Sequence, residues 1–157
     1  LGTALGRAGC TVITGGGPGL MEAASRGARA CGGKTIGLNI LLPHEQRPNR
    51  YLGRWETFEF FFLRKQMFLR RARAAFFLPG GLGTLDELAE TLALVQTRKM
   101  DPIPLVLLGS DYWKGLVDWM NGTLTESGAI GPGDPARLFN VVDSVSEALK
   151  CLGTKKL

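Results

Sequence analysis

Short apolar runs alternate with longer stretches of helical period along most of this chain of 157 residues. A short apolar run is typical of a strand buried in a parallel sheet, and apolar residues three or four apart are typical of a helix packed on one. The pattern predicts strands at Thr11–Thr14, Thr35–Leu38, Phe58–Phe60, Ala75–Leu78, Leu105–Leu108 and Phe139–Val142. It predicts helices at Pro18–Ala30, Leu63–Arg73, Leu85–Thr97, Tyr112–Leu124 and Val145–Leu152. This alternation predicts an α/β fold, a modified Rossmann-like parallel sheet with helices on both faces.

Two segments fall outside the alternation. Leu1–Ala8 has the pattern of the end of an amphipathic helix, whereas a doubly wound sheet normally begins with a strand. We therefore expect an N-terminal truncation that removes the first strand. Residues 41–56 predict a long loop or lid, since they include Pro43, His44, Pro48 and Asn49. Because no repeat or linker is present, we expect residues 1–157 to form a single nucleotide-binding domain.

Composition narrows the classes of function. The 22 glycines are about double the usual share, and many of them cluster in two short runs, which predicts specialised backbone turns there. A net charge of +5 favours anionic partners and suits a phosphorylated small molecule as well as nucleic acid. No apolar run is long enough to span a membrane, so no membrane partner is expected.

Cysteine and histidine exclude several kinds of chemistry. Cys10, Cys31 and Cys151 form no CxxC pair, which argues against a disulfide framework or a zinc site and predicts a reducing, cytoplasmic setting. His44 is the only histidine, which excludes Ser-His-Asp, Cys-His and multi-histidine metal sites. We therefore expect no bound metal.

The first glycine run joins a predicted strand to a predicted helix, in the sequence Thr14-Gly15-Gly16-Gly17-Pro18-Gly19-Leu20-Met21. Glycines allow a tight turn that exposes N–H groups to an anion. The run is not a dinucleotide fingerprint, because Leu38-Asn39 stands where an acidic ribose-binding residue is expected, and no Gly-Lys-Ser/Thr of a P-loop follows. By itself it fits a ligand site and a purely packing turn equally well.

The second run, Leu78-Pro79-Gly80-Gly81-Leu82-Gly83-Thr84-Leu85-Asp86-Glu87, also joins a strand to a helix. Ligands of open parallel sheets bind at the carboxyl ends of the strands, so both turns are expected to open onto one cleft. Thr84 and Glu87 have the spacing of a capping box, which spacing alone favours. The alternative is that Glu87, beside a phosphate-binding helix start, acts as a general base or stabilises a cation.

A basic helix lies between the two runs. Arg64 falls close to Phe61, Met67 and Phe68 on a helical wheel, so it is expected near the buried side, where a guanidinium needs an anionic partner. The other cations, Lys65, Arg70, Arg71 and Arg73, are expected on a solvated face. No aromatic stacking pattern accompanies them, so nucleic acid is not the expected partner.

Three motifs in order resemble the LONELY GUY family, long labelled "possible lysine decarboxylase": Gly15–Met21, Arg64-Lys65 with Met67, and Pro79–Glu87. The family signature is a GGGxGLM-like turn, then RK, then PGGxGTxxE, and the last motif is complete here. The resemblance continues through Gln96-Thr97, Pro104–Gly109 and Tyr112-Trp113, and so covers most of the chain.

The resemblance implies an enzyme that hydrolyses the N-glycosidic bond of nucleoside 5′-monophosphates and assembles into homodimers or larger oligomers. Members of the family release free cytokinin bases from their riboside monophosphates, and many accept AMP. By resemblance, Arg64 and Glu87 are the catalytic residues, and the substrate-binding residues are Gly17, Met21, Lys65, Gly81, Gly83 and Thr84. No cofactor is implied, and the older decarboxylase label finds no pyridoxal-phosphate lysine motif here.

The implied chemistry suits these residues. Loss of the base leaves an oxocarbenium-like ribose. Glu87 could stabilise this cation, or it could activate the water molecule that attacks it. Arg64 could hold Glu87 ionised, and the helix start at Thr84 could hold the 5′-phosphate. The sequence departs from the family in lacking the opening strand with its CGS-like loop.

Two other classes of function remain open. A non-catalytic nucleotide or molybdenum-cofactor carrier shares this sheet and similar glycine turns, but has no reason to keep Arg64 and Glu87 as a pair. A DNA-binding protein with this sheet is the third class, and an affinity unchanged between low and moderate salt would count against it.

Overall fold

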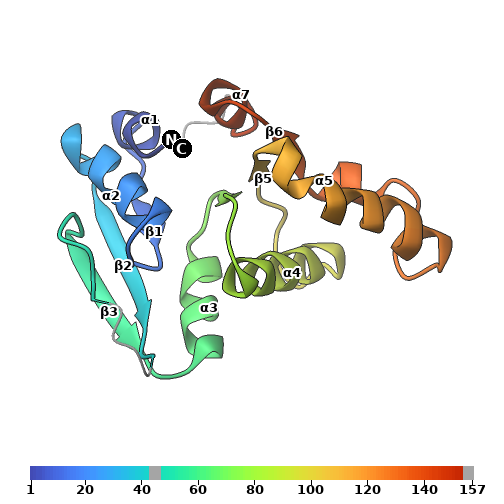
Figure 1. Cartoon of the computed structure of the whole chain (residues 1–157), viewed down its shortest axis with the longest axis horizontal. Coiled ribbons are helices and arrows are strands. Elements are labelled where there is room, and N and C mark those ends of the chain that lie inside the picture. Colours follow the sequence, from blue (N-terminus) through green and yellow to red (C-terminus); the bar gives the residue numbers. More distant parts are fainter. Residues whose placement is uncertain (43–46, 154–157) are drawn as a thin grey trace. The chain divides into compact units, whose positions relative to one another are not determined.

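The structure is a computed structural model that describes residues 1–42 and 47–153. The chain divides after Arg71 into two compact units, the first comprising Leu1–Arg71 and the second beginning at Ala72. Each unit contains its own three-stranded parallel sheet, and Figure 1 labels most of the elements of both.

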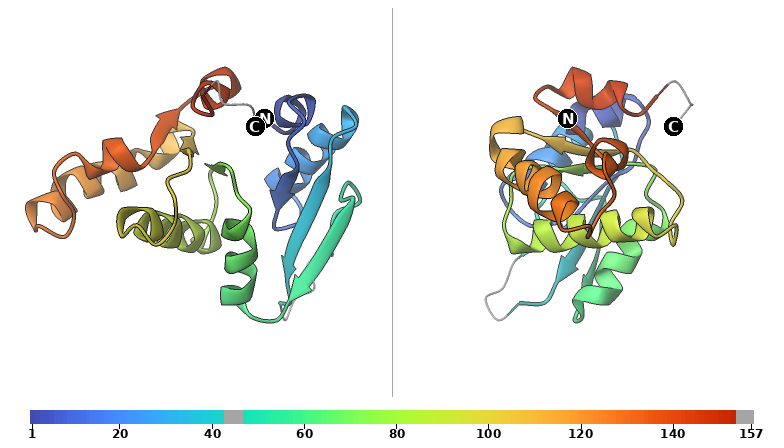
Figure 2. Two further views of the ribbon diagram at one scale, coloured as in Figure 1. Left: turned by 180° about the vertical axis from the view of Figure 1, so that it is seen from behind. Right: turned by 90° about the vertical axis from the view of Figure 1, so that its right-hand side faces the viewer.

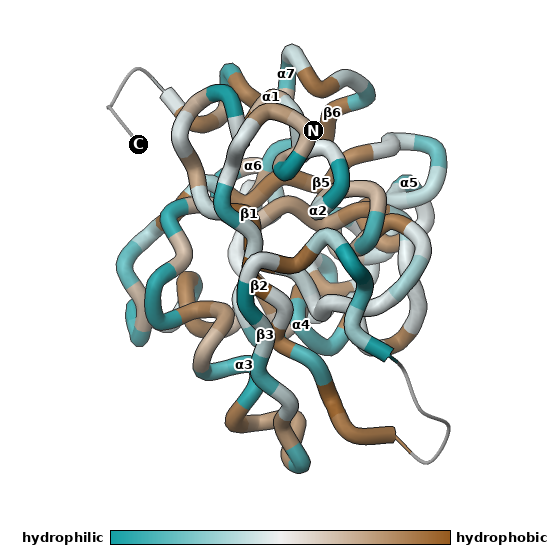
Figure 3. Tube along the Cα trace, turned by 90° about the vertical axis from the view of Figure 1, so that its left-hand side faces the viewer, coloured by the Kyte–Doolittle hydropathy of each residue, from teal (hydrophilic) through white to brown (hydrophobic). Residues whose placement is uncertain are grey.

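Unit 1 contains α1 (Gly2–Arg7), β1 (Val12–Thr14), α2 (Leu20–Ala30), β2 (Thr35–Ile40), β3 (Arg54–Phe58) and α3 (Phe61–Arg70). Its strand order is β1-β2-β3, with Ile13 paired to Ile36 and Leu38 to Glu56. The central strand β2 ends in a run of four buried residues, Gly37–Ile40, and Figure 3 shows hydrophobic residues in brown where the strand ends. Both faces of a central parallel strand are covered, so such a run is expected there.

Helices α1 and α2 lie side by side because their contact faces carry almost no side chains (Figure 2). A Cβ atom on Gly27 would lie 2.9 Å from the Thr3 hydroxyl oxygen, and one on Gly6 would lie 2.6 Å from Cys31 Sγ. Cys31 Sγ in turn donates to Ala28 O at 3.2 Å. Cys31 therefore packs between α1 and α2.

Unit 2 contains β4 (Ala75–Phe77), α4 (Leu82–Gln96), β5 (Leu105–Leu108), α5 (Ser110–Trp119), the π-helix η1 (Met120–Leu124), α6 (Asp134–Leu138), β6 (Asn140–Val142) and α7 (Val145–Lys150). The strand order is β4-β5-β6, with Leu107 paired to Phe77 and Val141. The buried core gathers around β5 and consists of Phe77, Leu88, Leu92, Leu105, Leu107, Trp113, Met120 and Phe139.

The predicted α/β class with parallel strands is confirmed, and the helix expected at the start of the chain is present. Several predicted boundaries were wrong, including those of the third strand and of the first long helix. The third strand is Arg54–Phe58, not Phe58–Phe60, so its first three residues do not belong to the predicted loop at 41–56. Helix α2 begins at Leu20 after an N-cap at Gly19, so Pro18 precedes the helix instead of opening it.

Both errors have a physical origin. Strand β3 has an exposed edge and the polar sequence RWETF, so no apolar run indicates it. Gly19 adopts a φ of +71°, a left-handed conformation that ends the turn one residue after Pro18. Helix α6 was not predicted because its five residues are too short to show a period.

Pro43 and His44 lie outside the described residues. Among the residues that are described, no helix is both long and apolar enough to cross a lipid bilayer. The three cysteines are free thiols.

Candidate functional site

The first glycine turn follows the carboxyl end of β1 in unit 1. Gly16 has a φ of +75°, and its N–H donates to Thr14 Oγ1 at 3.1 Å. A Cβ atom on Gly16 would lie 3.2 Å from Gly37 Cα, so the turn passes closely over β2. Glycine is required here both for the left-handed conformation and for this approach.

A buried asparagine that the sequence did not single out holds this turn. Asn49 Nδ2 donates to Gly16 O at 3.0 Å and to Gly17 O at 3.1 Å, and its backbone N–H donates to Gly16 O at 2.8 Å. Its Oδ1 accepts from Tyr51 N at 3.2 Å. The side chain therefore fixes the two glycine carbonyls, which points the peptide groups of the turn in a set direction.

Arg64 is buried in α3 with 9% of its surface exposed, as its helical position predicted. Its guanidinium carbon lies 5.3 Å from the Phe61 ring centre and 5.6 Å from that of Phe68, which is cation–π geometry. A Cβ atom on Gly15 would lie 3.8 Å from Arg64 Nη1 and 2.8 Å from Met21 Sδ. Unit 1 thus brings Arg64 and Met21 together at the first glycine turn, next to the buried Gly17.

The other cations on and just after α3 were predicted to lie on a solvated face, and the structure confirms this for most of them. Arg70, Arg71 and Arg73 are exposed, which confirms the solvated face expected for them. Lys65, next to Arg64 on the helix, is only half-exposed.

The second glycine turn follows β4 in unit 2 and opens the long helix α4. The helix starts at Leu82, with Gly81 as its N-cap in an extended conformation, and none of the described side chains caps it. The backbone N–H groups of Thr84 and Leu85 donate to Gly81 O at 3.0 and 3.2 Å. The predicted capping box between Thr84 and Glu87 is therefore wrong, because Thr84 is already the third residue of the helix.

The start of α4 has the features of an anion site. The Cβ positions of Gly81 and Gly83 meet no described atom within 4 Å, so the backbone there faces open space. The first N–H groups of any helix have no acceptor within it, and they lie at the positive end of the helix dipole. Gly80 is packed differently, since a Cβ atom there would collide with the Thr84 hydroxyl.

Glu87 lies one turn after Gly83, so the two residues share a face of α4. Its side chain is half-buried, and its backbone carbonyl accepts from Thr91 Oγ1 at 2.6 Å. Since the capping box is absent, helix capping does not explain a glutamate at this position. The alternative role of Glu87, in general-base chemistry or in stabilising a cation, stays open.

The start of α5 supports the second turn. The Tyr112 hydroxyl donates to Gly80 O. The N–H and hydroxyl of Ser110 donate to the Asp143 carboxylate, at 2.7 and 2.8 Å. These two hydrogen bonds lower the pKa of Asp143 below its ordinary value. The loops that follow β4, β5 and β6 are thereby tied together.

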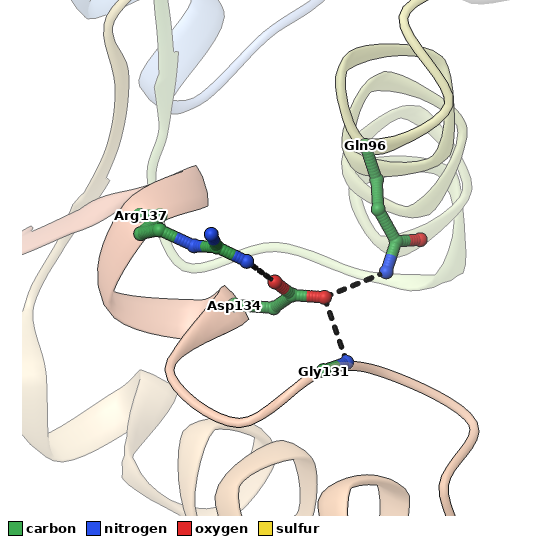
Figure 4. Close-up of polar contacts among 4 residues, drawn as sticks. All are labelled: Gln96, Gly131, Asp134 and Arg137. Atoms are coloured by element: carbon green, nitrogen blue, oxygen red, sulfur yellow. Dashed lines mark hydrogen bonds and ion pairs between the residues drawn. The ribbon is translucent and has the colours of Figure 1, made fainter.

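Gln96, at the other end of α4, has a structural role (Figure 4). Its Nε2 donates to Asp134 Oδ2 at 3.0 Å, and Gly131 N donates to the same oxygen at 2.8 Å. Arg137 forms an ion pair with the other carboxylate oxygen. The hydrogen bond from Gln96, then those from Arg137 and Gly131, lower the pKa of Asp134. This cluster joins the end of α4 to α6.

The predicted site residues divide between the units. Gly17, Met21, Arg64 and Lys65 belong to unit 1, and Gly81, Gly83, Thr84 and Glu87 belong to unit 2. In both units they gather at or after the carboxyl ends of strands. The single cleft that the sequence predicted stays a prediction. In the described ranges, no group of three or more His, Cys, Asp or Glu side chains is placed to hold a metal ion.

Residues 21–152 match the sequence model of the family described as "possible lysine decarboxylase". The chain belongs to this family. It is the LONELY GUY family, so the resemblance drawn from the three motifs is confirmed.

Named relatives of the chain include bacterial and plant proteins. A Mycobacterium tuberculosis protein named cytokinin riboside 5′-monophosphate phosphoribohydrolase is 34% identical over 153 residues, which are 96% of this chain and 80% of that protein. A protein of Oryza sativa subsp. japonica, named as a probable enzyme of the same activity, is 34% identical over 155 residues, which are 96% of this chain and 61% of that protein.

Solved structures confirm the fold. The molybdenum cofactor binding protein of Rippkaea orientalis has a TM-score of 0.67 at 21% identity, covering 95% of this chain and 79% of that one. The molybdenum cofactor carrier protein of Chlamydomonas reinhardtii has a TM-score of 0.63 at 23% identity, covering 98% and 84%. At such identities the likeness concerns the fold alone.

Proposed function

We propose that this chain hydrolyses the N-glycosidic bond of nucleoside 5′-monophosphates to a free base and ribose 5-phosphate. The observation that carries the proposal is the 34% identity, over 96% of the chain, to proteins named for this activity. The complete PGGxGTxxE motif supports it. The proposed substrates are AMP and cytokinin riboside monophosphates.

The start of α4 is the proposed site for the 5′-phosphate. Gly81 and Gly83 leave the backbone open, and the helix of 15 residues directs the positive end of its dipole there. Thr84 can add a hydroxyl hydrogen bond. An anion at this position replaces the side-chain cap that the helix lacks within its described surroundings.

Arg64 is the proposed partner of the substrate on unit 1. Its guanidinium lies within cation–π distance of two phenylalanine rings and near the first glycine turn, so packing around this buried side chain restricts its movement. A charge fixed in advance can orient a nucleotide and stabilise a carboxylate without reorganisation in the transition state. Gly17 and Met21 line the same side, and Lys65 follows on the helix.

Glu87 is the proposed general base. A water oxygen bonds to ribose C1′ while the bond from C1′ to the base nitrogen breaks, and the electron pair of that bond leaves with the base. Glu87 accepts one proton of the water and then releases it to solvent, and the departing base nitrogen takes up one proton from solvent, so the net reaction consumes one water molecule. The carboxylate also stabilises the positive charge that develops on the ribose ring. This reaction requires no cofactor.

The proposal includes assembly and setting. We propose that residues 1–157 act as one nucleotide-binding domain, that the protein is a homodimer, and that it works in the cytoplasm, for which its free cysteines are suited. Support for the dimer comes from exposed apolar side chains on and before α3, namely Phe60, Phe61, Phe62, Leu63 and Met67. Exposed apolar patches of this kind mark interaction surfaces.

Chromatography of the free base tests the function. The chain is incubated with AMP and with isopentenyladenosine monophosphate, beside the variants Arg64→Ala and Glu87→Gln. The expected result is base release by the parent and its loss in both variants, whereas the control Asp86→Asn, an exposed acid next to Glu87, keeps it. A parent chain that binds nucleotide without cleaving it would contradict the proposal and indicate a carrier.

A further inference from the structure

Unit 1 has a groove at the amino ends of its strands, away from its glycine turn. The groove has a volume of about 370 Å³. Thr11 precedes β1, Lys34 precedes β2 and Arg54 opens β3, and all three residues line it. The glycine turn instead follows the carboxyl end of β1, and β2 extends for six residues, or about 20 Å, between the two ends of the sheet.

Three cations from three elements line this groove. Arg29 comes from the last turn of α2, Lys34 from the loop that follows, and Arg54 from the first position of β3. Arg29 Nη1 lies 3.9 Å from the position of a Cβ atom on Gly53. In the part of the chain that the structure describes, none of the three forms an ion pair or a side-chain hydrogen bond.

The wall of the groove is held by hydrogen bonds. Thr35, only 2% exposed, donates from Oγ1 to Tyr51 O at 2.8 Å and accepts from Gly53 N at 2.8 Å. Gly53 N also donates to Thr35 O at 3.1 Å. The amino end of β3, and with it the backbone of Arg54, is thereby fixed to β2.

The charge of the chain is unevenly distributed. Residues 1–71 contain eleven Lys and Arg against four Asp and Glu, whereas residues 72–157 contain eight against ten. No acidic side chain is among the described residues that line the groove. Arg29 alone would be explained by the favourable position of a cation at a helix end. Three like charges around one groove repel each other, and a bound anion would relieve that repulsion.

We propose that this groove binds the phosphate or diphosphate group of a small molecule, separately from the substrate site. The volume lies within the range of small-molecule sites, about 300–1,000 Å³. None of the described lining residues is aromatic, so the groove offers no ring on which the bases of a nucleic acid would stack. The hydroxyl of Thr11, an exposed lining residue, supplies a further donor for phosphate oxygens.

The test is a titration of the ¹⁵N-labelled chain with inorganic pyrophosphate at low salt, followed by NMR. The expected result is saturable shifts of the amides of Lys34, Thr35 and Gly53. The triple variant Arg29→Gln, Lys34→Gln, Arg54→Gln is expected to weaken the binding reported by the amides of Thr35 and Gly53 by about tenfold or more. The shifts that pyrophosphate causes at the amides of Gly81 and Gly83, in the proposed substrate site, are expected to be the same in this variant as in the parent.

A control variant removes the same charge elsewhere. Arg70→Gln, Arg71→Gln, Arg73→Gln changes three exposed cations outside the groove and is expected to keep the groove shifts. Equal weakening by both triple variants would overturn the proposal, because it would show general attraction to a basic protein. Absence of groove shifts when pyrophosphate is added to the parent would also overturn it. A second titration uses a single-stranded oligonucleotide, and groove shifts caused by the oligonucleotide but not by pyrophosphate would overturn the proposal too.

Folding of the groove variant is measured by urea unfolding. Because the three cations have no partner among the described residues, their removal is expected to leave the urea midpoint unchanged or raised. A lowered midpoint would indicate a structural role for the cations and would overturn the proposal. Base release by this variant is expected to match the parent, so failure of the groove and failure of the proposed hydrolase are distinguishable.

Discussion

Asn49 connects the loop after β2 to the first glycine turn by side-chain and backbone hydrogen bonds. Its side chain bonds two carbonyls that are 33 and 32 residues away in sequence. Nothing in the local sequence indicates such a contact, since an isolated asparagine between proline and arginine is typical of any loop. Long-range hydrogen bonds of this kind depend on the folded chain and cannot be predicted from a single sequence.

We expect Asn49→Ala to lower the free energy of unfolding by about 2 kcal/mol, because it removes two buried hydrogen bonds and leaves the Gly17 carbonyl without the side-chain donor, while Gly16 O keeps its bond from the backbone N–H of residue 49. Urea unfolding measures the change. The matched control is Asn121→Ala in the exposed part of η1, which is expected to change little. A loss below about 0.5 kcal/mol for Asn49→Ala would show that the turn holds its shape without this side chain.

Asp134 makes stability depend on pH. Its pKa is lowered by the hydrogen bonds from Gln96, Arg137 and Gly131, so the ionised form stabilises the folded state. That stabilisation is fully present above the unfolded-state pKa, about 3.9, and is lost as the pH falls through the lower folded-state value.

The corresponding prediction concerns Asp134→Asn. The variant is expected to be less stable than the parent at neutral pH, and the difference should shrink as the pH falls below about 3.9. Thermal unfolding at a series of pH values measures it, with the exposed Asp101→Asn as control. A difference that stays constant from neutral to acid pH would contradict the assignment.

At the scale of elements, the start of α4 was the least well predicted part of the site. The capping-box spacing at Thr84 and Glu87 is real, but the helix begins three residues earlier than predicted, at Leu82, because Gly81 takes the N-cap conformation. Arg64 was correctly predicted to be buried, although Phe61 and Met67, its apolar neighbours on the helical wheel, are themselves exposed. Strand β3 was misplaced because a polar edge strand has no apolar signal.

The open N-cap yields a prediction that separates stability from function. Gly81→Asp supplies a side-chain cap and is expected to stabilise the chain by a few tenths of a kcal/mol. It also places a negative charge where we propose the 5′-phosphate binds, so KM for AMP is expected to rise at least about tenfold. There is room for the new side chain, since no described atom lies within 4 Å of the Cβ position.

Gly81→Asn is the matched control, because asparagine caps a helix about as well as aspartate and carries no charge. Its KM is expected to rise less than that of Gly81→Asp. Urea unfolding and initial-rate kinetics on the same preparations measure both effects. Equal KM values for the two variants would contradict a phosphate site at the start of α4.

At the scale of the whole molecule, the motifs predicted the family and the apolar pattern predicted the fold class. The division into two units after Arg71 was not predicted, because a change of compact unit without a linker has no compositional signal. Family membership was predictable because the glycine turns and the RK pair keep their order and spacing over most of the chain.

The proposed dimer yields a prediction for the apolar surface of α3. Leu63 and Met67 lie one turn apart and are 45% and 46% exposed. We expect the parent to sediment as a dimer, and Leu63→Glu, Met67→Glu to sediment as a monomer, because a buried interface does not tolerate two unpaired charges. Trp119→Glu, at an exposed apolar residue of α5, is the control and should remain dimeric. A monomeric parent would contradict the proposed dimer.

The most direct test of the proposed hydrolase is a double-mutant cycle on kcat/KM for AMP, with the parent, Arg64→Ala, Glu87→Gln and the double variant. Each single variant is expected to lose about 100-fold or more in kcat/KM. The double variant is expected to lose no more than the less active of the two single variants, because the effects of residues that act as one unit are not additive. Circular dichroism confirms that all four proteins are folded. Full turnover by a folded Glu87→Gln variant, or losses that multiply in the double variant, would contradict the account.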